Sequence, residues 1–180
     1  MGRDGFGMDP RERIIELIRT SRIHYREEEL EKLLLVDYGL GNLEKEGVGL
    51  TDIVYTPALR LKILAMLPNQ TLPEHKHPPY GEWRGKEETI RVVYGTMRVY
   101  LPGEENMTEG FLPERKEEYY TVRNESILTP IDQLTIEPDT WHWFQAGPKG
   151  AVAYAFYPQA VERKNYFRDP GVPEKIAPGY

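Results

Sequence analysis

The sequence predicts a mainly β protein, built as one small barrel that follows two α-helices. Three observations support this prediction. Apolar residues recur at helical spacing only before Val36. From Val48 onward, short runs rich in Val, Ile, Tyr and Leu alternate with clusters of Pro, Gly and Asn, which is typical of consecutive β-strands. No helix-length periodic segment interrupts these runs, so we expect them to pair as an antiparallel sandwich or small barrel.

The composition is ordinary for a soluble globular protein and excludes several classes of function. The net charge is −6, and Lys and Arg are scattered, which argues against a nucleic-acid-binding surface. No apolar run approaches the roughly 20 residues of a membrane span, and the charged N-terminus does not resemble a signal peptide. We therefore expect a cytoplasmic protein with no membrane partner. The chain has no cysteine, which excludes disulfides, thiolate nucleophiles and cysteine-ligated metals.

The N-terminal part is expected to hold the two helices. Residues 1–8 are Gly-rich and lack periodicity, so we expect a disordered lead-in to a single domain at residues 9–180. Asp9 and Pro10 suit the start of a first helix that ends near Arg22. A second helix is expected to begin near Arg26, where acidic residues suit the positive end of the helix dipole. Together the helices take up about residues 9–36, and we expect them to pack outside the barrel or at a dimer contact.

The barrel is expected to occupy about residues 48–158. A tight hairpin turn is expected at Gly95, between two of the strands. The tail, residues 159–180, is rich in proline and is expected to lie extended over the surface. The predicted strands are Asp52–Thr56, Leu59–Leu67, Thr71–His77, Thr89–Tyr94, Met97–Leu101, Glu118–Arg123, Ser126–Leu128, Gln133–Ile136, His142–Ala146 and Ala151–Tyr157.

Three of the four histidines fall in strand contexts that suit a metal site. His75 and His77 are two residues apart, so a β-strand projects both side chains from one face. Glu88 and His142 lie on later strands and can each add a ligand. Three nitrogens and one carboxylate oxygen suit a first-row divalent ion, with room for water or substrate. A lone His-x-His is common on protein surfaces, but the nearby carboxylate favours the metal site. The fourth histidine, His24, lies between the helices and is not assigned.

These residues also resemble the motifs of a known superfamily. His75-x-His77, ten intervening residues, Glu88, six intervening residues and Gly95 resemble the first motif of the cupins. The segment PDTWH, which ends at His142, resembles the second motif. Two features depart from the usual pattern: the gap between His77 and Glu88 is long, and Asp139 stands where a glycine is usual. The resemblance implies a cupin barrel, also called a double-stranded β-helix or jelly roll.

A closer resemblance is to the D-lyxose ketol-isomerase family of the cupins. The phrases VDYGLG, NQTLPEHKHPP, GKEETIR, YTV and HWFQAG carry it, from Val36 to about Pro170. That family tolerates the long insertion before the Glu. The resemblance implies a homodimer and a manganese ion held by the four residues already named, His75, His77, Glu88 and His142. Ligand type alone leaves Co²⁺, Fe²⁺, Ni²⁺ and Zn²⁺ open.

The implied reaction is the interconversion of free aldoses and ketoses, D-lyxose with D-xylulose and D-mannose with D-fructose. It moves a proton between C1 and C2 through an enediol or enediolate, so a general base is required. Lys86, two residues before Glu88, is our candidate, although it could instead be a solvated loop residue. Strand alternation directs Tyr94 inward with Glu88, and Phe144 inward with His142, so we expect both to contact substrate. Trp141 and Trp143 share the opposite face and are expected to fill core or interface.

One departure leaves alternative functions open. The family commonly has a Glu where this chain has Ala155, and the carboxylates that could compensate are Glu74, Glu82, Glu87 and Asp169. A phosphosugar isomerase of the cupin type would need a basic cluster at the pocket, for which Arg84, Lys86 and Arg91 are available. A non-catalytic sugar-binding or sensing cupin and an iron-dependent cupin oxygenase are further alternatives.

Overall fold

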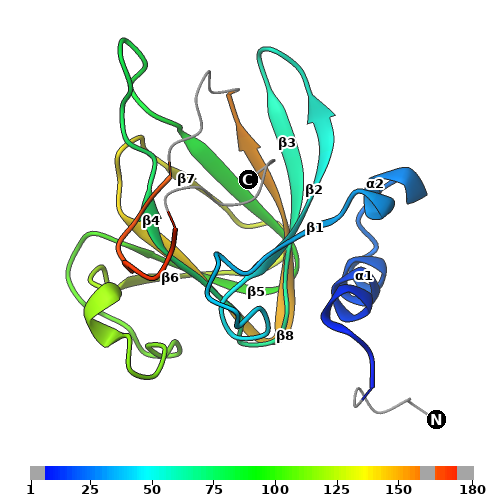
Figure 1. Ribbon diagram of the computed structural model, residues 1–180, viewed down its shortest axis with the longest axis horizontal. Helices are drawn as coiled ribbons and strands as arrows, with labels where there is room; N and C mark the ends of the chain where they lie inside the picture. The colour runs from blue at the N-terminus through cyan, green and yellow to red at the C-terminus, as the bar shows by residue number, and fades with distance from the viewer. Residues whose placement is uncertain (1–6, 159–164, 174–180) are drawn as a thin grey trace.

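The computed structural model describes residues 7–158 and 165–173, and these form the expected mainly β architecture. One continuous nine-stranded sheet curls into a barrel, and α1 (Pro10–Ser21) and α2 (Glu27–Glu31) lie outside it on one side (Figure 1). No helix of the described residues is long and apolar enough to cross a membrane. The strands are β1 (Leu34–Val36), β2 (Val48–Tyr55), β3 (Arg60–Met66), β4 (Thr71–Lys76), β5 (Glu88–Leu101), β6 (Asn124–Leu128), β7 (Gln133–Ile136), β8 (His142–Tyr157) and β9 (Tyr166–Phe167).

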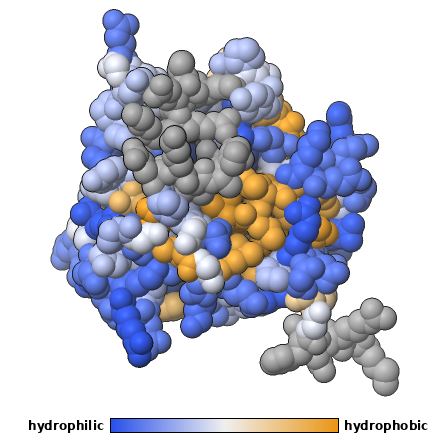
Figure 2. Space-filling view, viewed as in Figure 1, coloured by the Kyte–Doolittle hydropathy of each residue, from blue (hydrophilic) through white to orange (hydrophobic). Residues whose placement is uncertain are grey.

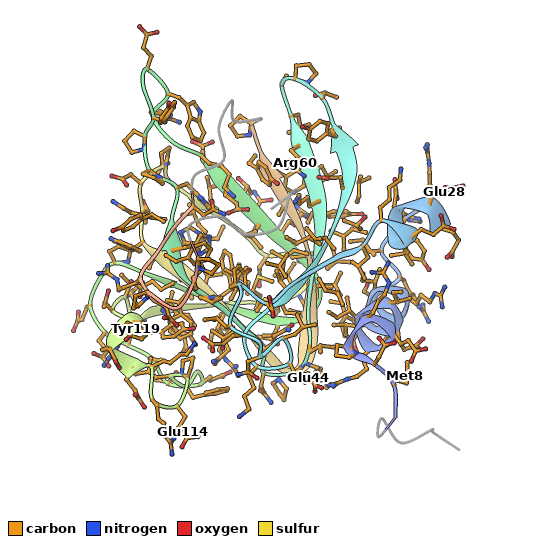
Figure 3. All side chains as sticks on the ribbon, viewed as in Figure 1. Met8, Glu28, Glu44, Arg60, Glu114 and Tyr119 are labelled. Carbon is orange, nitrogen blue, oxygen red and sulfur yellow. The ribbon has the colours of Figure 1, made fainter. Side chains whose placement is uncertain are left out.

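Helix α1 begins as the sequence predicts. The side chain of Asp9 accepts hydrogen bonds from the backbone N–H groups of Arg11 and Glu12, and Glu12 accepts one from Asp9 in return. The helix packs on the outer face of the sheet. Its Arg13 forms an ion pair with Glu44. Glu44, labelled in Figure 3, lies in the loop after β1. The helix-side cluster that results contains Ile14, Ile18, Ile23, Leu30, Leu33, Ile63, Ala65, Leu67 and Val152.

The second helix is shorter than predicted, because strand β1 takes over its last residues. From Leu33 to Val36 the chain is apolar at every position. Leu33 and Leu35 pack in the helix-side cluster, whereas Leu34 and Val36 pack in the barrel interior. Only an extended chain sends alternate residues to two opposite faces, so these residues pair with β2 as a strand.

Two long strands join the two layers of the barrel. β5 and β8 are antiparallel along their whole length. The C-terminal half of β8 pairs with β3, and its N-terminal half pairs with β4. One layer therefore reads β1-β2-β3-β8-β5-β7, and the other reads β9-β4-β8-β5-β6. The barrel core between the layers contains side chains from both, among them Ile90, Val92, Leu72 and Val99.

The predicted hairpin at Gly95 is wrong, because β5 continues through this residue. The pairing of β5 with β8 shifts register on both sides of Gly95, which marks a bulge where the two strands bend. Gly95 has φ +71°, and a Cβ at this position would overlap the carbonyl oxygen of Gly150. The shift also reverses the faces: Tyr94 pairs with Val152 and packs against the helix-side cluster. The prediction that Tyr94 points into the barrel is therefore wrong.

Two other predictions need correction. The predicted strand Glu118–Arg123 is instead a 3₁₀ helix, η1 (Glu117–Tyr119), followed by irregular chain. Of the predicted surface tail, residues 165–173 are described: β9 pairs with β4, and Asp169 and Val172 are buried. The rest of the tail and residues 1–6 of the predicted lead-in lie outside the described residues.

Figure 2 shows apolar residues gathered near the middle of one face, with a mainly hydrophilic periphery.

Candidate metal centre

Three strands bring the four predicted metal ligands to one point. His75 lies on β4 and His77 directly follows it, Glu88 is the first residue of β5, and His142 is the first residue of β8. One potential ligand atom from each residue lies within 4.8 Å of the others, and all four side chains are buried. His75 and His142 are partners in the β4–β8 register, which places their rings 4.2 Å apart.

Each histidine ring is oriented by an oxygen at Nδ1. The Nδ1 atom of His75 lies 2.9 Å from the carbonyl oxygen of Pro73, and that of His142 lies 2.8 Å from the carbonyl oxygen of Thr140. The Nδ1 atom of His77 lies 2.7 Å from Oδ1 of Asn165. Because the two carbonyl oxygens only accept, Nδ1 carries the proton in His75 and His142, and the lone pair of Nε2 is left for a metal ion. In His77 the oxygen of Asn165 favours the same arrangement.

The burial of the site keeps the rings neutral. Burial lowers the pKa of His75 well below its ordinary value, and the positive charge that His142 and His77 could carry lowers it further. Burial also lowers the pKa of His142, to about 3. The pKa of His77 is lowered by burial and by Lys86. A neutral imidazole is the form that binds a metal. These rings are already neutral near neutral pH, so they need not lose an extra proton before a metal ion binds.

Glu88 is ionised in the same surroundings. Burial alone would raise the pKa of this carboxyl, but the charge of Lys86 and the adjacent ring of His77 lower it well below its ordinary value. Nζ of Lys86 lies 3.0 Å from Oε2 of Glu88, and Nε2 of His77 lies 3.1 Å from the same oxygen. The centre thus combines three neutral nitrogen ligands with one anionic oxygen ligand.

The residues fit a divalent metal ion. Among the described residues, Nε2 of His142 has no hydrogen-bond partner, although the atom is buried. Oε2 of Glu88 lies 4.0 Å from this nitrogen, beyond hydrogen-bond distance. A buried polar atom without a partner costs free energy, and a metal ion would satisfy it. The set of three imidazoles and one carboxylate suits first-row divalent ions in general.

A cavity lies beside the candidate ligands. Phe144 faces it as predicted, with its ring 5.4 Å from that of His142. Lys86 also lines it: its side chain is only 15% exposed and lies over the ring of Tyr157, so it is not a solvated loop residue. Tyr94 does not reach the cavity. The lining residues are Leu50, Lys62, Leu64, Leu72, His75, Lys86, Glu88, Phe144, Ala155, Tyr157 and Asn165.

Sequence reasoning missed Lys62, Asn165 and Phe167. Lys62 is buried on β3, directly opposite Ala155 on β8. A signal for it exists, since it is the single charged residue within the apolar run Leu61–Met66. Asn165 and Phe167 contact the histidines from the end of the chain, and Asn165 is 88 residues from His77. No short-range pattern could have indicated those two contacts.

The carboxylates proposed to compensate for Ala155 lie elsewhere. Glu74 accepts hydrogen bonds from Thr121 and Val122 on the opposite side of β4. Asp169 pairs with Lys116, and Glu87 with Arg84. None of the four, Glu82 included, lines the cavity, and among its described lining residues Glu88 is the one carboxylate.

The basic cluster that a phosphosugar would require is not assembled by the three predicted residues. Arg84 is exposed and binds Glu87, while Arg91 lies on the outer face and donates to Gln133. Only Lys86 of the three lines the cavity.

The departure at Asp139 has a local explanation. Its φ is +58°, in the left-handed region that favours glycine, which is the usual cupin residue here. Asp tolerates this conformation better than most residues. Its carboxylate also forms a 2.7 Å ion pair with Lys76.

Three relatives match most of the chain. Proteins named D-lyxose ketol-isomerase from Thermofilum sp. and Cohnella laeviribosi are 39% and 41% identical over 165 residues, covering 91% of this chain and 92% and 91% of theirs. A D-lyxose/D-mannose isomerase from Thermosediminibacter oceani is 40% identical over 162 residues, which cover 89% of this chain and 90% of that protein. No family model matches the chain.

Solved structures with the same fold include L-ribose isomerases. That of Cellulomonas parahominis has a TM-score of 0.73 at 14% identity, with 92% of each chain covered. That of Geodermatophilus obscurus has a TM-score of 0.72 at 17% identity, covering 89% of this chain and 91% of that one. At such identities the similarity establishes the fold alone. Because relatives at 39–41% identity cover about nine tenths of both chains, this protein belongs to the D-lyxose ketol-isomerase family of the cupin superfamily and is an isomerase.

Proposed function

We propose that this protein is a metal-dependent isomerase of free sugars, which interconverts D-lyxose with D-xylulose and D-mannose with D-fructose. The buried cluster of His75, His77, Glu88 and His142, beside a cavity that contains Lys86, is the observation that carries the proposal. The names of the relatives, D-lyxose ketol-isomerase and D-lyxose/D-mannose isomerase, support the choice of sugars.

The four clustered residues would hold the ion, which we propose to be Mn²⁺. When bound there, a divalent ion would polarise the sugar carbonyl and stabilise the negative charge of an enediolate. The residues of the chain hold the ligands in place beforehand. The oxygens at Nδ1 orient the three rings, and Lys86 keeps Glu88 ionised.

The chain must also move a proton between C1 and C2 of the sugar. We assign this role to Lys86, because its Nζ lies 3.0 Å from a ligand oxygen and its side chain lines the cavity where substrate would bind. The neutral amine would take the proton from one carbon and return it to the other, and the positive charge of a divalent ion bound at Glu88 would favour that neutral form. Lys62 lines the same cavity, and we propose that it binds a hydroxyl group or the developing oxyanion of the sugar. The ring of Phe144 gives an apolar surface for the C–H face of the substrate.

The proposal extends to the state of the protein in the cell. We propose that the two helices and the barrel act as one domain, that the protein is a cytoplasmic homodimer, and that its partner in the reaction is a small sugar. The family resemblance supports the dimer, and the composition supports the location. Size-exclusion chromatography with light scattering tests the dimer, for which it should give about twice the chain mass of 20.9 kDa.

A panel of sugars tests the proposed function. The manganese-loaded protein should convert D-lyxose and D-mannose to ketoses and should act at least ~100-fold more slowly on D-mannose 6-phosphate, because Arg84 and Arg91 lie outside the cavity. Faster turnover of the phosphorylated sugar would favour the phosphosugar alternative. Tight sugar binding without turnover would favour a sugar-binding protein.

A further inference from the structure

Residues 165–173, here called the C-terminal segment, contact two of the candidate metal ligands. Oδ1 of Asn165 lies 2.7 Å from Nδ1 of His77. The ring of Phe167 stacks on the ring of His75, with centroids 5.2 Å apart and planes at 23°. Phe167 belongs to β9, which pairs with β4 at His75 and at the next residue, and Asn165 directly precedes this strand. The segment thus contacts the metal centre, and its Asn165 also lines the cavity.

Several anchors hold the C-terminal segment against the barrel. The backbone N–H of Arg168 donates to the carbonyl oxygen of Glu74 at 3.0 Å, and its side chain donates to the buried carboxylate of Glu74 at 2.6 Å. Its guanidinium group also lies 3.9 Å from the ring centroid of Trp141. Further along, Asp169 pairs with Lys116 and Val172 enters the barrel core. Together these contacts fix the position from which Asn165 reaches His77.

The contact at Nδ1 bears on the tautomer of His77. A neutral imidazole carries its proton on one nitrogen only, and a metal ion requires the lone pair of the other. In His77, Nε2 faces Oε2 of Glu88 at 3.1 Å, so that carboxylate favours a proton on Nε2, which would block metal binding. The oxygen of Asn165 favours the proton on Nδ1 instead.

We propose that Asn165 is a positioning residue that selects the metal-binding tautomer of His77, and that docking of the C-terminal segment and metal binding stabilise each other. The inference rests on the metal centre of the proposed function. Because coupling between two binding events is reciprocal, a docked segment raises metal affinity, and a bound metal ion protects the segment from opening.

Three variants of the full chain test the role of Asn165. Asn165→Ala removes the acceptor, whereas Asn165→Asp keeps an oxygen in its place. Tyr166→Ala is the matched control, because Tyr166 directly follows Asn165 but is 61% exposed. Strand alternation directs its side chain away from the face on which Phe167 stacks on His75. Titration with Co²⁺ gives the affinity, and the visible spectrum of the bound ion reports the ligand geometry independently of sugar turnover.

We expect Asn165→Ala to weaken Co²⁺ binding about 10- to 100-fold and to change the spectrum, since partners of ligating histidines typically have effects of this size. Asn165→Asp and Tyr166→Ala should retain affinity within ~3-fold of the unmodified protein. The inference is overturned if Asn165→Ala binds Co²⁺ normally, or if the Ala and Asp variants lose affinity equally.

Hydrogen exchange measured by mass spectrometry tests the reciprocal effect. Metal ions should slow exchange in residues 165–173 of the unmodified protein and should have a much smaller effect there in Asn165→Ala. Exchange in this segment that is unchanged by metal contradicts the coupling. An unmodified protein that binds no Co²⁺ would overturn the metal centre itself, whereas normal binding with an unaffected Asn165→Ala variant would overturn only this inference.

Discussion

At the scale of single residues, the centre depends on three histidines that stay neutral in a buried site. The low pKa values leave a single proton on each of the rings of His75 and His142, and the hydrogen-bond acceptors at Nδ1 place it there, so together they leave Nε2 free of a proton. Glu88 supplies the one negative charge, and Lys86 balances it at 3.0 Å. This arrangement can accept a divalent ion without first releasing a proton.

Loss of one ligand should remove the metal. We expect His142→Ala to lower metal affinity by more than about 100-fold and to abolish isomerisation, because the loss of a ligand should exceed the loss of its hydrogen-bond partner. Metal analysis of the purified variant and a ketose assay measure both effects. His24→Ala is the control, since His24 is exposed and lies between the helices. A fully metal-loaded and active His142→Ala variant would contradict the assignment.

Lys86 should affect turnover more than metal binding. We expect Lys86→Ala to lower kcat about 100- to 10,000-fold, which is the usual contribution of general acid–base catalysis, while the protein still binds metal. Arg84→Ala serves as the control, because Arg84 is nearby but exposed and paired with Glu87. Steady-state kinetics of metal-loaded samples give the comparison. Unchanged kcat in Lys86→Ala would remove this residue from the proposed role.

The metal-free protein should lose stability in acid. In the unfolded chain a histidine titrates near ~6.5, whereas the pKa of His142 in the fold is about 3. Between these values the unfolded state binds more protons, so the free energy of unfolding falls as the pH drops below ~6.5. Urea unfolding of chelator-treated protein at several pH values measures the slope. His142→Gln should have a shallower slope, and equal slopes in the two proteins would refute the explanation.

At the scale of elements, the bend shared by β5 and β8 decides which residues reach the site. Alternation along β5 correctly places Ile90 and Val92 inside with Glu88, but the bulge then moves Tyr94 to the helix side. The two-residue alternation of a strand therefore predicts which face of the sheet a side chain occupies only up to the first register shift. Gly95 did indicate a special backbone position, although the position is a bulge and not a hairpin turn.

Gly95→Ala should test this bend. The substitution places a Cβ against the Gly150 carbonyl in a backbone with φ +71°, so we expect a loss of more than ~2 kcal/mol in the free energy of unfolding. Gly81→Ala is a suitable control, because Gly81 also has positive φ, +57°, but has open space around it. It should cost only about 1 kcal/mol. Equal losses from the two substitutions in urea unfolding would contradict the close packing at Gly95.

At the scale of the whole molecule, the sequence predicts the barrel, the first helix and the cluster of candidate ligands. His75 and His77 are recognisable because one strand carries both, and Glu88 and His142 each begin a strand. The contacts of Asn165 and Phe167 could not be predicted, because they depend on where the end of the chain docks. Lys62 could have been noticed as a charge within an apolar strand, but its place opposite Ala155 depends on strand pairing.

The most direct test of the account is whether D-lyxose turnover depends on the metal. Protein stripped with a chelator should convert no D-lyxose, and the same sample reloaded with Mn²⁺ should produce D-xylulose. His142→Ala, treated in the same way, should remain inactive after reloading. Equal D-xylulose production by the stripped and reloaded samples, or none by the reloaded protein, would contradict the claim that this His75, His77, Glu88 and His142 cluster is the metal centre of a sugar isomerase.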